Sequence, residues 1–357
     1  MKVVFDVQHL YYLPQYLPVI DVLKEFTQEI KLIGYESDNL LLNKIVKKSL
    51  VDTGLEYEIV EDWKEALSNY LLDKPHWIIF GNAVSNLDQL HRASKTVLMQ
   101  HGVGPKSIYY EVSKNPTSVR FVEGIKRLSK LNKMFPDGNF IDSGFAKLDP
   151  VVNKKIKIES LSSLGLDKSK PTLLYAPTFY PSSIELFSKN FPEDFKDFNI
   201  ILKPHFFSLT LNKYKGQRHL LEAWGKFNNV YLTKIEDYNL INFIIISDVL
   251  ISDASSSIFE FAALDKPVIW CDFYKLRWSY RGLFSFRFKK RIDESIEVFH
   301  RLCERAENYK NLKNAVLNTI SYPDSKKSIR NTITQEYVGK VDGLCSKRIV
   351  EYLRDNK

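Results

Sequence analysis

The sequence has 357 residues, of which 44% are hydrophobic and 26% are charged. These proportions are ordinary for a water-soluble globular protein and exclude a fibrous or low-complexity chain, and the length favours two domains. The formal net charge of +8 predicts an anionic partner: a phosphorylated substrate, an acidic membrane face or nucleic acid. The simpler alternative is a solvated basic surface. No arginine-rich tract or nucleic-acid motif accompanies the charge, so nucleic acid is the least favoured partner.

The three cysteines, Cys271, Cys303 and Cys345, are widely spaced. They fit neither a metal site nor a disulfide framework, and they indicate reduced thiols in a cytoplasmic protein. The segment Met1–Asp6 is too short and too acidic to predict a signal peptide. The most apolar run, Ile241–Ile251, is too short and too polar to span a bilayer, so any membrane contact is expected to be peripheral.

The first hundred residues alternate apolar strands with amphipathic helices. The first helix is expected to start at Pro14 and to turn Leu17, Ile20, Leu23 and Phe26 inward. Such alternation predicts a parallel sheet with helices on both faces. The expected strands are Val3–Phe5, Ile30–Tyr35, Tyr57–Val60, His76–Phe80 and Lys95–Gln100, and the further helices are Leu40–Ser49, Asp62–Leu72 and Leu87–Ala93.

The last of these strands runs into a glycine-rich turn, residues 101–106. Its glycines, Gly102 among them, allow close approach of a ligand to the backbone. His101 is expected at the carboxyl end of the strand, where it is a candidate acid–base group, although a lone histidine is usually structural. Lys106 is expected to supply charge to a phosphate.

Residues 108–131 are expected to be helical in parts, with a break at Pro116. The first domain is expected to end at residue 150. A polar, lysine-rich linker, residues 151–170, follows it around one short helix, Ser160–Leu164.

The second domain repeats the pattern of buried strands followed by polar residues. Because the carboxyl ends of parallel strands meet at one sheet edge, Thr178, His205 and the turn 253–256 are expected to converge there. A helix is expected over Asp237–Ile246. The expected strands are Thr172–Tyr175, Asn199–Leu202, Val230–Leu232, Val249–Ile251 and Val268–Trp270.

The turn after Val249–Ile251 is the strongest candidate for a phosphate site. The run Ser257-Ile-Phe-Glu260 is a capping box, which predicts a helix start near Ser257. Backbone N–H groups and the positive end of a helix dipole favour a phosphate beside Asp253, Ser255 and Ser256. The alternative is that these serines only cap the helix.

The C-terminal part is expected to be mainly helical. The aromatic and basic segment Trp278–Arg291 is suited to an anionic lipid face or a phosphorylated acceptor, but an irregular surface strand is the favoured interpretation. Helices are expected over Asp293–Asn308, Leu312–Thr319 and Tyr337–Leu353.

From about Gln100 to the C-terminus the chain resembles the CDP-glycerol glycerophosphotransferase family of teichoic acid primases and polymerases. The family pattern His-Gly-Thr-Pro-x-Lys is similar to residues 101–106, with departures at 103–105. Tyr-Ala-Pro-Thr matches 175–178. Lys-x-His-Pro resembles 203–206, where Phe206 replaces the last proline, and Asp-Tyr-Ser-Ser resembles 253–256, where Ala254 replaces the tyrosine. Two further segments, 277–282 and 342–346, are similar to Tyr-x-x-x-Arg-Gly and Asp-Gly-x-x-Ser.

The resemblance implies an α/β protein of GT-B architecture, with two doubly wound Rossmann-like domains facing across a cleft. Residues 1–150 would form the acceptor-side domain and residues 171–335 the nucleotide-donor domain. Residues 336–357 would form a C-terminal helix that crosses back to the first domain.

The resemblance also implies an activity. The family moves a polyol phosphate, glycerol or ribitol phosphate, from a CDP-activated donor to a hydroxyl of a surface-polysaccharide or lipid-linked acceptor and releases CMP. This implies a role in teichoic acid or capsule polysaccharide biosynthesis for the cell envelope. The expected location is the cytoplasm, with peripheral contact at the anionic inner face of the cell membrane.

Several residues take expected roles from the resemblance. His101 would be the general base, and Lys203 and His205 would neutralise charge on the leaving phosphate. Asp253 would orient the serines that hold the pyrophosphate. No Asp-x-Asp motif is visible, so no obligatory metal is expected, although a loosely held Mg²⁺ is compatible with the sequence. The catalytic set is His101 and His205, and the donor-binding set is Gly102, Lys106, Thr178, Lys203, Asp253, Ser255, Ser256, Ser257 and Arg281, with Arg277 as a weaker phosphate candidate.

Two other functions remain open. A nucleotide-sugar glycosyltransferase or a UDP-sugar 2-epimerase-like enzyme on the same fold would release UDP rather than CMP. A non-catalytic nucleotide-binding partner would bind nucleotide and be indifferent to the loss of His101.

Overall fold

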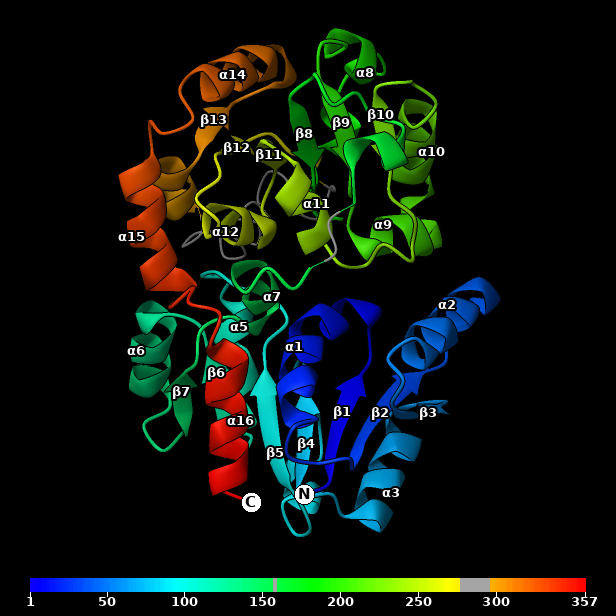
Figure 1. Cartoon of the computed structure of the whole chain (residues 1–357), viewed down its shortest axis with the longest axis vertical. Helices are drawn as coiled ribbons and strands as arrows, with labels where there is room; N and C mark the ends of the chain where they lie inside the picture. The colour runs from blue at the N-terminus through cyan, green and yellow to red at the C-terminus, as the bar shows by residue number, and fades with distance from the viewer. Residues whose placement is uncertain (157–158, 277–295) are drawn as a thin grey trace. The chain divides into compact units, whose positions relative to one another are not determined.

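The computed structural model describes residues 1–156, 159–276 and 296–357 (Figure 1). The described chain divides into two compact units. Unit 1 comprises Met1–Val103, Ile108–Lys155 and Gln335–Lys357, and unit 2 comprises Gly104–Ser107 and Ile156–Thr334. The expectations for Arg277, Arg281 and most of Trp278–Arg291 lie outside the described residues.

Unit 1 is built on a parallel sheet. Its described residues form seven strands in the order β3-β2-β1-β4-β5-β6-β7. The sheet interior is apolar, as expected when helices cover both faces. The strands are β1 (Val3–Val7), β2 (Ile30–Tyr35), β3 (Glu56–Val60), β4 (Trp77–Phe80), β5 (Lys95–Met99), β6 (Val119–Val122) and β7 (Phe140–Asp142).

Most helices of unit 1 connect successive strands. Helix α3 (Trp63–Asp73) shows a typical start, because the Asp62 carboxylate accepts hydrogen bonds from the N–H groups of Lys64 and Glu65. The other α-helices are α1 (Leu13–Leu23), α2 (Leu40–Val51), α4 (Leu87–Leu90), α5 (Ile108–Glu111), α6 (Ile125–Met134), α7 (Asp149–Val152) and α16 (Cys345–Asp355), and the 3₁₀ turns are η1 (Leu10–Tyr12), η2 (Val112–Lys114) and η3 (Ala146–Leu148).

Unit 2 contains a second parallel sheet with the same winding. Its described strands run in the order β10-β9-β8-β11-β12-β13. Two doubly wound parallel sheets confirm the predicted α/β fold class. The strands are β8 (Thr172–Tyr175), β9 (Asn199–Leu202), β10 (Val230–Leu232), β11 (Val249–Ser252), β12 (Val268–Cys271) and β13 (Glu304–Ala306). The helices are α8 (Phe191–Asp194), α9 (Phe206–Thr210), α10 (Lys215–Trp224), α11 (Ile241–Ile246), α12 (Ser257–Ala262), α14 (Tyr309–Ser321) and α15 (Lys327–Tyr337), and the 3₁₀ turns are η4 (Leu161–Leu164), η5 (Ile184–Leu186) and η6 (Asn212–Tyr214).

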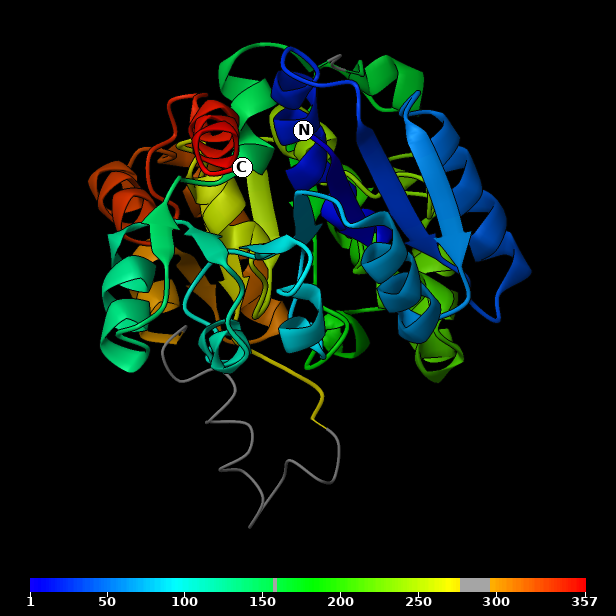
Figure 2. The ribbon, with the colours of Figure 1, turned by 90° about the horizontal axis from the view of Figure 1, so that it is seen from below.

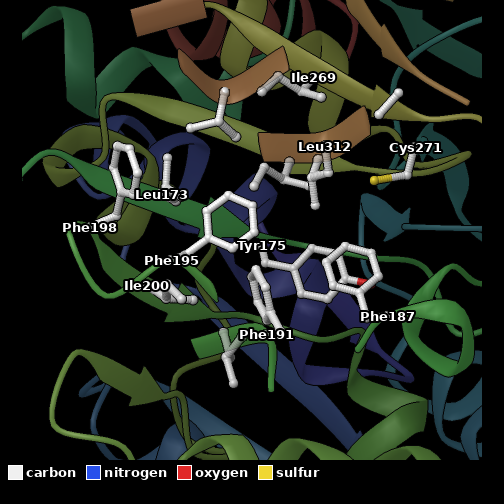
Figure 3. Close-up of a cluster of buried hydrophobic side chains, with 14 of the residues drawn as sticks. Leu173, Tyr175, Phe187, Phe191, Phe195, Phe198, Ile200, Ile269, Cys271 and Leu312 are labelled. Carbon is white, nitrogen blue, oxygen red and sulfur yellow. The ribbon is translucent and has the colours of Figure 1, made fainter. Parts of the chain in front are cut away.

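An aromatic core fixes the end of β8 in unit 2 (Figure 3). The rings of Tyr175 and Phe187 stack with centroids 4.5 Å apart, and Phe191 meets Phe187 edge-on at 5.0 Å. Both arrangements are favoured geometries for aromatic pairs. The Tyr175 hydroxyl also lies 2.9 Å from Ser183 Oγ, so the core holds the loop that follows the strand.

Two strands of unit 1, β6 and β7, are not predicted by the sequence pattern. Residues 108–131 read as helical in parts, but Val119–Val122 form β6. Arg120 interrupts the apolar run of this strand and is nevertheless buried. Its guanidinium donates to Ser113 Oγ at 2.6 Å and to the Tyr109 carbonyl at 2.7 Å, and these partners offset the cost of burial.

Three expectations about helices are wrong. The helix expected over Tyr337–Leu353 is interrupted, because α15 ends at Tyr337 and α16 begins at Cys345. The end of the helix expected over Asp293–Asn308 is instead β13, which pairs with β12. Phe26 does not point inward: α1 ends at Leu23, and the Phe26 side chain is 48% exposed.

The late Asp-Gly-x-x-Ser segment attaches α16 to unit 1. The Asp149 carboxylate accepts hydrogen bonds from the N–H groups of Cys345 at 3.2 Å and Ser346 at 2.7 Å. Gly343 has φ +73, and its carbonyl accepts from the Asn153 side chain at 2.8 Å. This motif therefore has a structural explanation within unit 1.

The last residues of the chain are bonded to β4 and β5, near the start of the chain. Trp77 Nε1 donates to the Leu353 carbonyl at 3.0 Å, and Lys95 Nζ donates to the Asn356 carbonyl at 2.7 Å. The two termini consequently lie close together in both views of the ribbon (Figures 1 and 2).

Replacing Asp149 with alanine should destabilise the attachment of α16. Loss of a helix cap typically costs about 0.5–2 kcal/mol, and two N–H groups in a buried position would lose their acceptor. We expect a lower urea midpoint for Asp149→Ala. Asp355→Ala removes an exposed carboxylate from the end of the same helix and should leave the midpoint unchanged. Equal midpoints for Asp149→Ala and the wild type would contradict this role.

Candidate active site

His101 follows β5 in unit 1 and has a defined tautomer. Its Nδ1 lies 2.9 Å from the carbonyl oxygen of Gly81, which follows β4. Gln100 Nε2 lies farther away, 3.4 Å from the same nitrogen. The shorter contact is with a carbonyl oxygen, which only accepts hydrogen bonds, and it favours a proton on Nδ1. In the neutral ring, Nε2 therefore holds the lone pair. This is the tautomer that a general base acting through Nε2 needs.

Aromatic rings surround the His101 imidazole. Tyr12 stacks on it with centroids 5.0 Å apart and an interplanar angle of 23°, and Tyr11 and Tyr109 approach at 5.2 Å and 6.1 Å. A Cβ on Gly102 would collide with the Tyr109 hydroxyl. Packing within unit 1 therefore explains the glycine at position 102 without a ligand.

His9 is a polar residue near this cluster that the sequence reasoning missed. Its ring stacks on Tyr11 with centroids 4.9 Å apart and meets Tyr12 edge-on at 5.6 Å. Burial lowers the pKa of His9 to about 4, so the ring is neutral at pH 7. The available signal was its position just after the buried strand β1, since the other two site histidines also follow strands.

Asp253 connects the two loops at the switch point of unit 2, where β8 and β11 lie side by side and the winding reverses. Its carboxylate accepts hydrogen bonds from Thr178 N at 2.6 Å, and from Ser183 N and Ser183 Oγ at 3.0 Å each. Asp253 was expected to orient the serines of its own turn, but its carboxylate instead holds the loop after β8. Only its backbone carbonyl contacts that turn, accepting from Ser255 N at 2.7 Å.

The environment of Asp253 perturbs its ionisation. Burial raises the pKa of Asp253 to about 7, against the lowering effects of its hydrogen bonds and of the Lys106 charge. Lys106 is thus close enough to Asp253 for electrostatic interaction within unit 2. Gly104, in the same segment, has φ +102, and a Cβ there would collide with the Phe259 ring. Close packing against α12 therefore favours glycine at this position.

The predicted capping box does not form. Helix α12 begins at Ser257 as expected, but the N-cap residue is Ser256, which has helical dihedral angles and makes no side-chain cap. A capping side chain needs an extended N-cap backbone. Ser255 Oγ instead accepts from the Ser257 N–H at 3.3 Å.

The three serines differ in what they offer a ligand. Ser257 is buried, and its hydroxyl donates to Ser255 Oγ at 2.9 Å and lies 3.2 Å from Ser252 Oγ. Ser255 and Ser256 are half-buried. Within the described part of the chain, the Ser256 hydroxyl makes no hydrogen bond, so it is the most available donor of the turn.

His205 has the opposite tautomer to His101. Its Nδ1 accepts a hydrogen bond from Phe207 N at 3.1 Å, which caps α9. In the neutral ring the proton is consequently on Nε2, which makes that nitrogen a donor. The Phe179 ring packs 4.6 Å from His205, so the loop that carries Thr178 lies beside this histidine.

Unit 2 thus brings together five predicted site residues at one sheet edge: Lys106, Thr178, His205, Asp253 and Ser255. Lys203 lies at the same edge, since its N–H donates to the Tyr175 carbonyl at 2.9 Å. His101 and Gly102 belong to unit 1.

Among the described residues, no group of three or more His, Cys, Asp or Glu side chains is arranged to hold a metal ion. None of the described helices combines the length and apolar character that crossing a bilayer requires.

The raised pKa of Asp253 predicts a pH-dependent stability. The unfolded carboxyl has a pKa near 3.8, so between about pH 4 and 7 the folded chain keeps a proton that the unfolded chain loses. This contribution is complete below that window and lost as the pH rises through about 7. We expect the free energy of unfolding of the wild type to fall with rising pH relative to Asp253→Asn, as measured by urea unfolding across this window.

Asp167→Asn is the matched control, because hydrogen bonds from Ser169 lower the pKa of this exposed carboxyl and cannot produce a loss in that direction. If the free energies of unfolding of the wild type and Asp253→Asn differed by the same amount at every pH between about 4 and 7, Asp253 would be ionised throughout that range.

Solved structures share the fold. The wall teichoic acid polymerase TagF has a TM-score of 0.68 and 15% identity, and the match covers 99% of this chain and 88% of that one. The UDP-GlcNAc 2-epimerase from Neisseria meningitidis has a TM-score of 0.61 and 16% identity, with 99% and 100% coverage. At these identities the similarity concerns the fold alone.

Two curated relatives come from Bacillus spizizenii (strain ATCC 23059 / NRRL B-14472 / W23). The teichoic acid poly(glycerol phosphate) polymerase is 28% identical over 204 residues, which is 49% of this chain and 47% of the relative. The teichoic acid glycerol-phosphate primase is 30% identical over 155 residues, which is 42% of this chain and 39% of the relative. The matched stretch therefore spans less than half of either relative.

The sequence model of one family matches residues 82–354, which leaves His9, Tyr11 and Tyr12 outside the match and includes all the predicted site residues. The match covers well over half of the chain and confirms the resemblance that the motifs indicated. The chain belongs to the CDP-Glycerol:Poly(glycerophosphate) glycerophosphotransferase family.

Proposed function

We propose that the chain transfers a polyol phosphate, glycerol or ribitol phosphate, from a CDP-activated donor to a hydroxyl of a surface-polysaccharide or lipid-linked acceptor. The acceptor oxygen attacks the phosphorus that bears the polyol. The new P–O bond replaces the bond to the bridging oxygen, and CMP leaves with that oxygen. Family membership supports this activity, and the opposite tautomers of His101 and His205 are the observation that carries the assignment of roles.

In this proposal His101 takes the proton of the attacking hydroxyl. The Gly81 carbonyl keeps the proton on Nδ1, so Nε2 is the nitrogen that accepts. Once protonated, the imidazolium stays bonded to the same carbonyl, which stabilises the positive charge it has gained. Contact with Tyr12 restricts the ring to one orientation.

His205 and Lys203 act on the leaving group. The backbone N–H of Phe207 keeps His205 Nδ1 as an acceptor, so Nε2–H points a donor at the phosphate on which negative charge grows. Lys203 follows β9 at the same sheet edge and supplies a full positive charge. Charge stabilisation of this kind is the main contribution a protein makes to phosphoryl transfer.

The donor pyrophosphate is held by the turn after β11 and the loop after β8. Ser255, Ser256 and the Thr178 hydroxyl donate to phosphate oxygens, with Lys106 as a further charge. Helix α12 has only 6 residues, so nearby hydroxyls and backbone N–H groups carry the binding more than a long helix dipole does. Ser257 supports the turn internally.

The units take different roles in this proposal. Residues 171–335 bind the donor, residues 1–150 bind the acceptor, residues 151–170 link them, and residues 336–357 return to the first domain. The setting is teichoic acid or capsule polysaccharide biosynthesis in the cytoplasm, with peripheral contact at the inner face of the membrane. The step needs no obligatory metal, and Mg²⁺ on the donor phosphates would be an accessory.

A second candidate is an enzyme that acts on a UDP-sugar. The observation that favours it is the fold similarity to the N. meningitidis UDP-GlcNAc 2-epimerase over the whole length of that protein. The products separate the two candidates, because the transferase gives CMP, whereas a UDP-sugar enzyme gives either UDP or an epimerised UDP-sugar.

The proposal predicts that His101→Ala abolishes most CMP release. Removal of a general base should slow the reaction by roughly 10²- to 10⁴-fold. The measurement is nucleotide release from CDP-glycerol, CDP-ribitol and UDP-sugars, with a lipid extract or saccharide acceptor present. His219→Ala, an exposed histidine of α10, is the control and should match the wild type. UDP release, or conversion of a UDP-sugar into its epimer, would favour the UDP-sugar enzyme. Donor binding without turnover, unchanged in His101→Ala, would favour a non-catalytic nucleotide-binding partner.

The tautomer of His205 predicts which substitutions at this position should keep activity. Glutamine can place an N–H donor near the position of Nε2, whereas asparagine retains the α9 cap but does not reach the phosphate. We expect His205→Gln to keep more activity than His205→Asn, and His101→Gln to be as inactive as His101→Ala. A fully active His205→Asn variant would mean that His205 serves only as a cap.

A further inference from the structure

The sheet of unit 1 has a switch point of its own, between β1 and β4. These two strands pair directly, with β2 and β3 on one side and β5 to β7 on the other, so the winding reverses between them (Figure 1). Open α/β sheets bind ligands at the carboxyl ends of the strands at such a point. Residues 8–12 follow β1 and residues 81–83 follow β4. The transfer reaction proposed above gives His9 and Tyr11, in the first of these segments, no role.

His9 and Tyr11 form a stacked aromatic pair at this switch point. Their ring centroids lie 4.9 Å apart with an interplanar angle of 18°, and both residues are half-buried. The Tyr11 ring also lies 5.2 Å from the ring of His101, which follows the next strand, β5. The pair therefore lies directly beside the candidate general base, within unit 1.

The packing of Tyr12 fixes the position of this pair. The Tyr12 ring is buried and meets His9 edge-on at 5.6 Å and Tyr11 edge-on at 5.0 Å. A Cβ on Gly81 would collide with the Tyr12 ring, so the turn after β4 is shaped to admit it. The Tyr12 hydroxyl is hydrogen-bonded to the side chains of Tyr11 and Asn82. The two turns at the switch point are thereby joined before any ligand binds.

The charge at this switch point does not suit a phosphate. Residues 8–12, 81–83 and 100–103 include neither lysine nor arginine, and His9 is neutral at pH 7 because burial lowers its pKa to about 4. The Asp6 carboxylate, near the end of β1, accepts hydrogen bonds from the hydroxyls of Tyr35 and Tyr70 at 2.7 Å each. Burial raises the pKa of Asp6 to about 6, which still leaves it mostly ionised at pH 7. A neutral ligand is favoured over an anion here.

We propose that His9 and Tyr11 form an acceptor subsite that binds the pyranose ring of an uncharged saccharide. The C–H groups of a sugar ring carry partial positive charge and pack against the negative faces of aromatic rings. Sites that bind small ligands commonly combine such apolar rings with a few polar groups, and the amide of Asn82 can hydrogen-bond sugar hydroxyls. The end of a polyol phosphate chain would instead bring a negative charge toward Asp6.

This inference rests on the proposed transfer reaction and makes its acceptor more specific. The hydroxyl that loses its proton to His101 Nε2 would belong to a sugar, and His9 and Tyr11 would hold the ring that carries it. Residues 8–12 lie outside the family match, which begins at residue 82, so family membership alone does not assign this role.

The first test is binding without a donor. Saturation-transfer NMR on the full chain, with irradiation of aromatic protons, should transfer signal to the ring protons of methyl glucoside, methyl galactoside or methyl N-acetylglucosaminide. Tyr11→Leu keeps an apolar side chain but removes the aromatic face, and it should weaken binding about tenfold, whereas Tyr11→Phe should bind like the wild type. Tyr322→Leu is the matched control, because Tyr322 is 66% exposed and belongs to unit 2.

The second test is transfer from a CDP-polyol to octyl glycosides of the same sugars or to octyl glycerol phosphate. The octyl glycosides should be the better acceptors. Tyr11→Leu and His9→Leu should each raise the KM for the glycoside about tenfold, and Tyr322→Leu should match the wild type. Unchanged circular dichroism would verify that the leucine variants are folded.

The two tests separate this subsite from the transfer reaction. Pyranosides that do not bind the wild type, or that bind Tyr11→Leu equally well, would overturn the subsite. Transfer to octyl glycerol phosphate but not to the glycosides would also overturn it, while the transfer reaction itself would stand. Pyranoside binding that depends on Tyr11, without CMP release from any CDP-polyol, would support the sugar site and reject the transfer reaction.

Discussion

The buried carboxylate of Asp253 is the interaction on which the organisation of unit 2 depends. A buried charged or polar group is tolerated only with hydrogen-bond partners, and here the partners come from the loop after β8. Two loops that begin on adjacent strands are thereby fixed to each other at the switch point of the sheet. Thr178 belongs to one loop and Ser255 and Ser256 to the other, so their spacing follows from a contact that needs no ligand. Tyr175 connects the same loop to the aromatic core, because its ring stacks on Phe187 and its hydroxyl contacts Ser183 Oγ.

The two histidines of the candidate site show how the backbone can set the tautomer of a side chain. His101 and His205 both follow a parallel strand, and in both a backbone group meets Nδ1. At His101 this group is a carbonyl and at His205 it is an N–H, so the two rings present opposite hydrogen-bonding character at Nε2. A hydrogen-bond acceptor and a hydrogen-bond donor can thus be built from one residue type by a change of backbone partner. Substitutions that preserve the histidines but move Gly81 or Phe207 would disturb the same chemistry.

The sequence predicted most of the sheet strands, and the strand ends that carry the candidate site residues, because these depend on local pattern. Apolar runs followed by polar residues located the strand ends where Thr178, His205 and Asp253 lie. Other features depend on contacts between distant segments and left no pattern. Arg120 is compatible with β6 only through Ser113 and Tyr109, and the partner of the Asp253 carboxylate is a loop some seventy residues earlier in the chain. The failed capping box depended on the backbone conformation of Ser256, which residue types do not specify.

The order of the two units along the chain affects how unit 2 could be exchanged by recombination. Both termini belong to unit 1 and lie together, and nearly all of unit 2 is one continuous stretch between them. Unit 2 is thus arranged as an insertion into unit 1, so recombination could exchange it as a cassette through two breakpoints. The exception is Gly104–Ser107, which is encoded within unit 1 but packs with unit 2. A transplanted cassette would meet a foreign partner at Phe259, and the short stretch after His101 would have to change with it.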